Sequence, residues 1–225
     1  MPELTRLAAA DAALRPAYGS PELPEAPNRW SLLLRVLLVG PNPAPLTPAM
    51  SDVLQSPLLL DPQTASTSTT GQLVELLTPI PRGPQKASLI RAIAAWWLAQ
   101  FSSECDPDLS GNWQTARDGL RRIRGLGPAT VDELLLFVGQ APVFPLDRGT
   151  IRVAVRHGWL DLPLEEDDAQ DFFVRGLREG QIEPRGFSML MGRVAEAHCG
   201  REPKCDACPL QPLLPLNGPL NPESC

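Results

Sequence analysis

Residues 120–130 read LRRIRGLGPAT, and this stretch is the most informative part of the sequence about the fold. An apolar helix end, a Gly-Leu-Gly turn at 125–127 and the start of a second apolar helix predict a tight helix–hairpin–helix. Glycines at both corners permit positive φ, and their bare backbone lets N–H groups approach an anion closely. Because the second helix begins at the turn, its N-terminus adds unpaired donors and a favourable dipole. The stretch is therefore suited to bind phosphate.

The charge around this stretch is opposite in sign to that of the whole chain. The 225 residues carry 26 acidic and 20 basic side chains, a net charge of −6, whereas residues 111–160 hold 4 acids and 7 arginines. Arginine suits phosphate because its planar fork donates several hydrogen bonds. Two ordinary explanations remain open, a solvated helix face and a helix–helix turn with a glycine C-cap. Arg122 and Arg124 stand nearest to the glycines and are the first candidates for phosphate contacts.

A second motif follows at 142–150, which reads PVFPLDRGT. Two prolines favour an extended approach and place the carboxylate of Asp147 just ahead of a predicted helix at 150–157. An N-cap is the ordinary role of an aspartate at such a position. The two roles are compatible, because a capped carboxylate is held in place and kept ionised. Asp147 is therefore a candidate for acid–base chemistry.

Cysteines form the third motif. Cys199, Cys205, Cys208 and Cys225 are separated by five, two and sixteen residues, and Cys105 lies apart. The first residues contain no basic segment followed by an apolar one, so we expect a reducing, cytoplasmic compartment. In that compartment, four cysteines predict a metal or cluster site in preference to disulfides. The sixteen-residue gap does not exclude Cys225, because loop-closure entropy grows slowly with length.

The rest of the chain predicts an all-α protein. Apolar residues recur at helical spacing, and strict two-residue alternation is rare, so a major sheet is not expected. Residues 41–70 predict a loop with a short element around 50–60. With 43% hydrophobic residues the chain is globular, and no apolar run reaches the roughly 20 residues of a membrane span. The predicted helices cover residues 30–39, 72–77, 86–101, 113–120, 130–138, 150–157, 170–177 and 188–199, with an acidic helix start at 165–168.

Taken together, residues 120–158 resemble the endonuclease III superfamily of base-excision DNA glycosylases. The hairpin glycines, Thr130, Phe144-Pro145 and Asp147 occur in the order typical of that family. The resemblance implies two helical lobes flanking a DNA-binding cleft. Residues 30–141 would form a six-helix barrel lobe that carries the hairpin. Residues 1–29 and 142–225 would form the second lobe, which ends in the cysteine loop.

The same resemblance implies a role for each candidate residue. Asp147 would be the catalytic carboxylate, and double-stranded DNA the partner. The cysteines would hold a [4Fe–4S] cluster, for which the family has six, two and five residues between ligands; a Cys₄ zinc site is the alternative. The implied ligands are Cys199, Cys205, Cys208 and Cys225, and the implied DNA-binding residues are Arg122, Arg124, Gly125, Leu126, Gly127 and Thr130.

Two departures from the family limit what the resemblance implies. Bifunctional relatives carry a nucleophilic lysine two residues after the second hairpin glycine, where this chain has Ala129, and only Lys86 and Lys204 are lysines. Relatives also place a glutamine after the first barrel helix, where this chain has Gly40-Pro41-Asn42. Ala129 predicts a monofunctional glycosylase. Asn42 is a candidate to replace the glutamine, and a purely structural loop is the other interpretation. Both departures favour the alternative of a DNA-binding relative with little or no activity, and a helical metal-binding module unrelated to DNA is a third possibility. We expect a monomer, without membrane contact, associated with the bacterial nucleoid.

Overall fold

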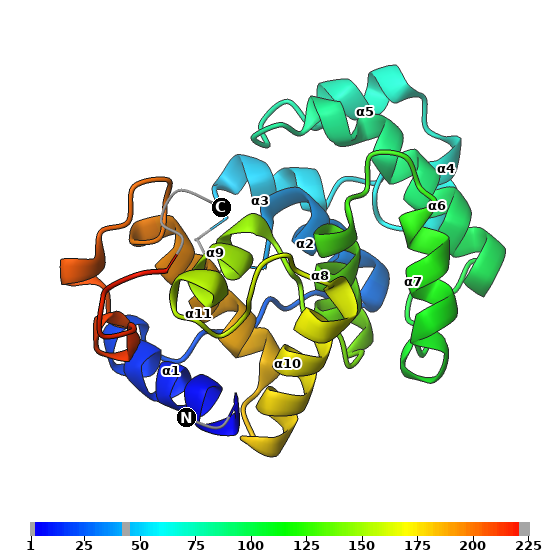
Figure 1. Cartoon of the computed structure of the whole chain (residues 1–225). Coiled ribbons are helices and arrows are strands. Elements are labelled where there is room, and N and C mark those ends of the chain that lie inside the picture. The colour runs from blue at the N-terminus through cyan, green and yellow to red at the C-terminus, as the bar shows by residue number, and fades with distance from the viewer. Residues whose placement is uncertain (1–2, 42–45, 221–225) are drawn as a thin grey trace. The chain divides into compact units, whose positions relative to one another are not determined.

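The computed structural model describes residues 3–41 and 46–220, which form helices and loops without a β-strand (Figure 1). The predicted all-α fold is confirmed. The chain divides into two compact units, which we call the central unit, residues 23–141, and the terminal unit, residues 1–22 and 142–225. Within the described ranges, no helix is long and apolar enough to cross a membrane.

The central unit packs short helices around a core rich in tryptophan. Helix α4 lies against α6, and both α2 and α7 lie against α8. Trp30 and Trp97 meet edge to face at 5.5 Å, and the Trp30 indole donates to the Leu59 carbonyl at 2.9 Å, so the polar edge of this buried ring has a partner. The elements are α2 (Arg29–Val39), α3 (Pro48–Leu54), α4 (Pro62–Thr67), α5 (Thr70–Leu76), α6 (Ala87–Phe101), α7 (Trp113–Arg121) and α8 (Pro128–Gly139), with 3₁₀ turns η1 (Pro84–Lys86) and η2 (Ser110–Asn112).

The segment predicted as a loop at 41–70 is more helical than expected. Helix α3 covers part of the short element foreseen around 50–60, but α4 was not predicted. The Asp61 side chain accepts from the Thr64 backbone N–H at 2.8 Å, and Pro62 occupies the first turn. An aspartate cap followed by proline is a strong helix start, which outweighs the weak helix propensity of serine and threonine over one and a half turns.

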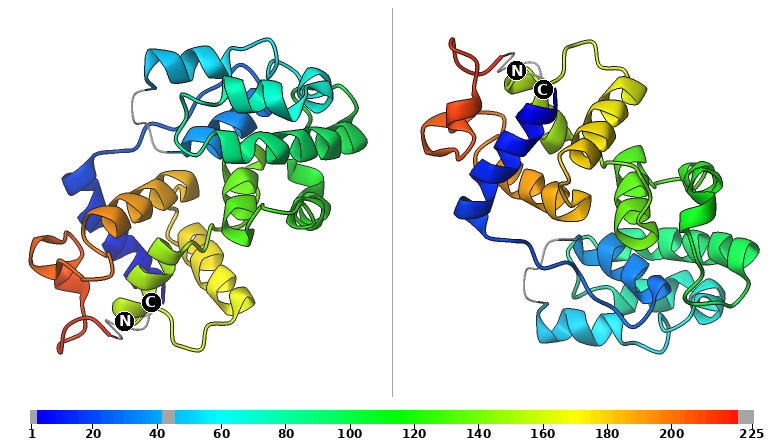
Figure 2. Two further views of the ribbon diagram at one scale, coloured as in Figure 1. Left: turned by 90° about the horizontal axis from the view of Figure 1, so that it is seen from above. Right: turned by 90° about the horizontal axis from the view of Figure 1, so that it is seen from below.

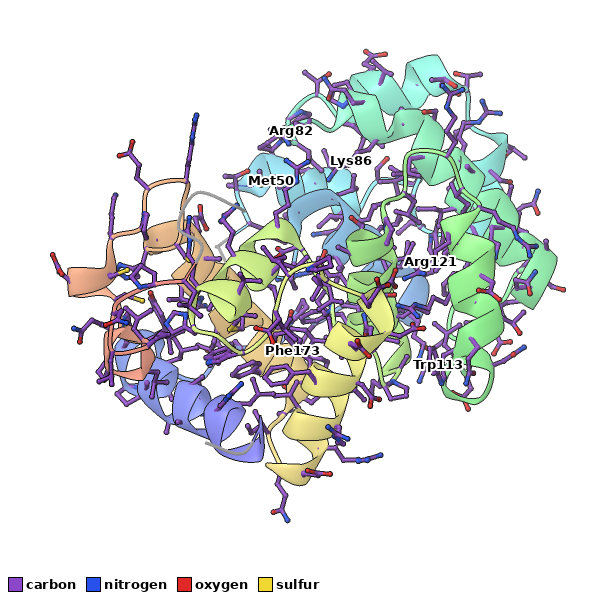
Figure 3. All side chains as sticks on the ribbon, viewed as in Figure 1. Met50, Arg82, Lys86, Trp113, Arg121 and Phe173 are labelled. Atoms are coloured by element: carbon purple, nitrogen blue, oxygen red, sulfur yellow. The ribbon has the colours of Figure 1, made fainter. Side chains whose placement is uncertain are left out.

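The terminal unit joins the two ends of the chain in one core. Helix α1 packs on α10 and α11, and α9 packs on α11, as the views from above and below show (Figure 2). Phe144 stacks on Phe173 at 4.5 Å within this core. Phe173 is labelled in Figure 3. The elements are α1 (Glu3–Tyr18), α9 (Arg148–Arg156), α10 (Glu166–Glu179) and α11 (Pro184–Ala197), with 3₁₀ turns η3 (Cys205–Ala207) and η4 (Gln211–Leu213).

Helix α1 was not among the predicted helices. Leu7, Ala10 and Leu14 are fully buried and follow the three-and-four spacing of one helical face. Alanines surround them on other faces as well, so the amphipathic signal in the sequence is weak. A Cβ on Gly176 would stand 2.8 Å from the Leu7 side chain, so glycine at that position lets α1 lie close to α10. Tertiary packing therefore decides where α1 lies.

Candidate functional site

The predicted hairpin is present between α7 and α8. Gly125 adopts a φ of +93°, a conformation that other residues rarely adopt, while Leu126 is buried beneath the turn. Gly127 differs from the prediction of positive φ at both corners, since it is extended with a φ of −73° and serves as the N-cap of α8. Nothing lies within 4 Å of a Cβ built on either glycine. The outer face of the turn is therefore open for a ligand to approach.

The start of α8 offers unpaired backbone donors. Gly127 has no side chain to cap the helix, and Pro128 occupies the first turn. The first N–H groups of a helix have no partner within it, and they carry the positive end of its dipole. An anion is the ligand that this arrangement favours. Thr130 lies in the same first turn, half-buried, beside the exposed part of the hairpin.

The arginines before the hairpin divide into two kinds. Arg117 and Arg121 contact the buried carboxylate of Asp132 in α8, with the closest Arg117 contacts at 2.7 Å and the Arg121 contact at 3.6 Å. Arg122 and Arg124 are exposed, and neither side chain forms a hydrogen bond or ion pair with any residue in the described ranges. The sequence analysis counted these four arginines together among the seven of residues 111–160. The structure uses two of them to hold the hairpin helices together and leaves two available to a ligand.

A groove of about 580 Å³ lies beside the hairpin within the central unit. Its walls include the C-terminal end of α2, the turn before α6, and hairpin residues 124–126. Arg82 and Lys86 line the groove. Both are labelled in Figure 3, and Arg82 has a positive φ of 58°. Sequence reasoning did not single out Arg82, because nothing local shows that its turn faces the hairpin.

Lys86 lines this groove but its amine is already engaged. Its Nζ donates to the carbonyls of Leu37 at 2.6 Å and Leu38 at 3.3 Å, at the C-terminal end of α2. A cation is favourable at a helix C-terminus. Burial lowers the pKa of the Lys86 ammonium from its usual value. Lys86 therefore supports the end of α2, and Ala129 brings no amine to the hairpin.

Asp147 caps α9 as predicted. Its Oδ1 accepts from the Thr150 backbone N–H at 2.6 Å, and the carboxylate is exposed. Its other oxygen accepts no hydrogen bond from a residue in the described part of the chain. The loop before it is held by Gln170, whose amide exchanges hydrogen bonds of 2.9 and 2.7 Å with the backbone of Phe144. One carboxylate oxygen is thus positioned by the cap while the other stays available to water or substrate.

Close packing of α9 against α11 holds Asp147 in place at the start of α9. A Cβ on Gly149 would stand 2.8 Å from the Cβ of Ala195, so only glycine lets the first turn of α9 lie against α11 at this spacing. Arg152 and Arg156 extend from the same helix toward the cysteine loop. Arg152 donates to the Cys199 carbonyl at 2.8 Å, and Arg156 donates to the Gly200 carbonyl at 2.7 Å. Helix α9 therefore links Asp147 and the cysteine loop through one rigid element.

Three of the four predicted cysteine ligands line one small cavity in the terminal unit, namely Cys199, Cys205 and Cys208. All three are free thiols, and Arg156 donates to the sulfur of Cys199 at 3.3 Å. Burial raises the pKa of the Cys205 and Cys208 thiols, and the other nearby thiols add to the rise. Cys225 lies outside the described residues, as does Asn42.

The chain is similar to known proteins in sequence and in structure. No protein-family model matches it. It is 29% identical over 127 residues to the protein named Endonuclease III of Sulfolobus acidocaldarius, a match over 56% of this chain and 54% of that protein. It also superposes on a solved endonuclease III trapped as a covalent intermediate with DNA, with a TM-score of 0.66 and 18% identity over 97% of this chain and 95% of that one. The chain has the endonuclease III fold.

A second solved structure shares this fold. A thermostable thymine-DNA glycosylase gives a TM-score of 0.65 at 12% identity, covering 99% of this chain and 95% of that one. The resemblance inferred from the hairpin and Asp147 is therefore confirmed. The matched stretch spans only about half the length of the Sulfolobus relative, so the activity of that protein does not by itself carry over to this chain.

The endonuclease III fold implies a [4Fe–4S] cluster, and the donor set is consistent with one. Three thiols line one cavity, and a buried arginine neutralises charge beside the first of them. Within the described ranges, no three His, Cys, Asp or Glu side chains are grouped so as to hold one metal ion. Three thiols are donors that suit either a four-iron cluster or zinc.

Proposed function

We propose that this chain is a DNA glycosylase that hydrolyses the N-glycosidic bond of a damaged or mismatched base. The observation that carries the proposal is the exposed carboxylate of Asp147, held at one oxygen by its cap and available at the other. The endonuclease III fold and the open hairpin support the same conclusion. Double-stranded DNA is the proposed partner.

DNA binding would begin at the hairpin. The backbone N–H groups at the start of α8 suit a phosphate, and Arg122 and Arg124 add positive charge beside them. Contacts of this kind fix register on the duplex without reading its sequence. Glycosylases then extrude the target nucleotide from the stack, because the bond to be broken is inaccessible in a paired duplex.

Asp147 would supply the chemistry of base removal. Cleavage of a glycosidic bond develops positive charge on the sugar, and a nearby carboxylate stabilises that oxocarbenium-like state. The same group can orient or deprotonate the attacking water. Its cap to Thr150 keeps one oxygen fixed and leaves the other available to water or to the sugar. The net reaction adds water across the bond, releasing the base and leaving a sugar hydroxyl.

The chain would act without a lyase step. A lyase reaction of the family type needs an amine that forms an imine with the sugar. Ala129 has no amine, and the Lys86 amine donates hydrogen bonds to two backbone carbonyls at the end of α2. Base removal by water is therefore the reaction that we propose for this chain. A catalytically inactive DNA-binding protein with this fold is the second candidate, and Ala129 together with the missing glutamine after α2 favours it.

We further propose that Cys199, Cys205 and Cys208 hold a [4Fe–4S] cluster together with a fourth ligand. When bound, the cluster would cross-link the 199–208 segment and contribute its binding free energy to folding of the terminal unit. Zinc is the alternative metal. We expect the protein to act as a monomer, with DNA of the bacterial cytoplasm as its substrate.

Free-base release tests the proposed function. A panel of duplexes, each with one damaged or mismatched base, is incubated with the purified holoprotein, and released bases are identified by mass spectrometry. Base release on one of these duplexes supports the glycosylase. Tight DNA binding with no release on any duplex would instead establish the inactive DNA-binding protein.

A further inference from the structure

The groove beside the hairpin is lined mainly by positive charge. Of the described residues that line it, three are basic and one is acidic, namely Arg82, Lys86, Arg124 and Glu133. The Lys86 amine is engaged by the end of α2. Arg82 and Arg124 reach the groove from two separate segments, the turn before α6 and the hairpin. Only Arg124 has so far been given a role in DNA binding.

The backbone of Arg82 is strained. Its φ of 58° lies in the left-handed region, which residues with a side chain rarely adopt. A glycine would adopt the same conformation without strain. Strained conformations persist only where the surrounding structure imposes them, and they are concentrated at sites that bind ligands. Formation of the turn therefore does not explain why the residue at position 82 is an arginine.

The turn that carries Arg82 is firmly held. Leu77 and Ile80 are buried, and the Gly83 N–H donates to the Ile80 carbonyl at 2.7 Å. A Cβ on Gly83 would overlap the Leu77 carbonyl oxygen, so only glycine fits directly after Arg82. The backbone of Arg82 is thus fixed at the wall of the groove by contacts that do not involve its side chain.

The side chain of Arg82 has no partner in the part of the chain that the structure describes. The residue is exposed, and its guanidinium forms no hydrogen bond or ion pair with any residue of ranges 3–41 and 46–220. Its charge nevertheless acts inside the groove. Burial lowers the pKa of Lys86, Glu133 opposes that change, and the positive charge of Arg82 adds to it. An anion bound in the groove would offset this repulsion between like charges.

We propose that Arg82 is a second phosphate-binding residue, and that one DNA strand passes along the groove between Arg82 and Arg124. The inference rests on the proposed function, because it takes DNA as the partner. The groove is continuous with hairpin residues 124–126, so a strand bound at the hairpin extends into it. The planar fork of arginine matches a phosphate. Arginine at position 82 then destabilises the free protein slightly and strengthens its complex with DNA.

Replacement of Arg82 by glycine tests the proposal, because stability and binding should change in opposite directions. Arg82→Gly should raise the melting temperature of the full-length holoprotein by about 1–3 °C, since glycine tolerates the positive φ. It should weaken binding to a duplex by roughly three- to tenfold at about 0.1 M salt, and lower the slope of log affinity against log salt by about 1. Thermal unfolding and fluorescence anisotropy provide the two measurements.

Three further variants serve as controls. Arg82→Lys keeps the charge but not the planar fork, so it should retain the salt slope and lose only part of the affinity. Ser102→Gly relieves another positive φ, of 53°, at an exposed residue of the central unit that does not line the groove. It should raise the melting temperature and leave binding unchanged. Arg82→Gly combined with Arg124→Ala should lower the salt slope by about 2.

Three results with Arg82→Gly would overturn the inference. Unchanged affinity and slope would show that DNA does not contact Arg82. A lower melting temperature would give the side chain a role in folding. Weaker binding with an unchanged slope would exclude a phosphate contact. A wild type that binds no duplex would refute the proposed DNA partner as well, whereas wild-type binding that Arg82→Gly leaves intact refutes this inference alone.

Discussion

Arg117 binds Asp132 through two parallel hydrogen bonds, each 2.7 Å long, and so joins α7 to α8 on the two sides of the hairpin. Only 2% of the Asp132 side chain is exposed, and Arg121 approaches the same carboxylate at 3.6 Å. A bidentate pair of this kind restricts the relative orientation of its two helices. The Arg117–Asp132 ion pair therefore holds together the two helices on either side of the hairpin turn.

Asp132→Asn should destabilise the central unit. Breaking a buried ion pair from one side typically costs about 3–5 kcal/mol, and the lower end applies because the Arg117 side chain is 17% exposed. Urea denaturation measures the loss, and the double variant with Arg117→Met should cost less than the sum of the single ones. Additive losses would show that the pair does not act as a unit.

Arg122→Ala and Arg124→Ala should each weaken binding to every duplex by a similar factor. Because each removes one phosphate contact, the slope of log affinity against log salt should fall by about 1 from a wild-type value that reflects roughly three to six neutralised phosphates. Fluorescence anisotropy across salt concentrations provides the measurement. Arg178→Ala, an exposed arginine on α10, is the matched control and should change neither quantity. Salt-independent binding by the wild type would contradict a phosphate site.

Asp147→Asn should retain stability and DNA binding while losing most base release. Asparagine caps a helix about as well as aspartate, so α9 keeps its start, but the amide cannot stabilise a positive sugar or accept a proton. Loss of one acid–base group typically costs about 10²–10⁴ in rate. Single-turnover base release measures the loss, and thermal unfolding serves as the stability control. An unchanged rate would remove this carboxylate from the mechanism.

Sodium borohydride should trap no covalent adduct between the wild type and DNA. An imine needs a free amine, and the hairpin carries Ala129 in place of lysine. Ala129→Lys should introduce weak strand cleavage and a trapped adduct, visible as a shifted band after gel electrophoresis. Should the wild type be trapped, Lys86→Met and Lys204→Met would show whether either lysine supplies the amine.

Much of the hairpin was predictable because its determinants are local. The apolar ends of α7 and α8, the glycines between them and the cap at Asp147 all act within a few residues, so the sequence indicated both helices and the position of the carboxylate. Helix α8 begins at Pro128, two residues before the predicted 130, because proline is well suited to the first turn of a helix.

What the sequence could not decide depends on contacts between distant segments. Arg117 and Arg122 look equivalent in a count of charges, and only the packing of α8 against α7 brings Asp132 to one of them and not the other. Nor does spacing show that Cys199, Cys205 and Cys208 line one cavity with residues of α9, because that cavity is formed by segments that are distant in the sequence. Sequence alone determined which chemical groups the chain carries and which turns present them. Tertiary packing decided which of those groups are already bound to the protein and which remain available to DNA or metal.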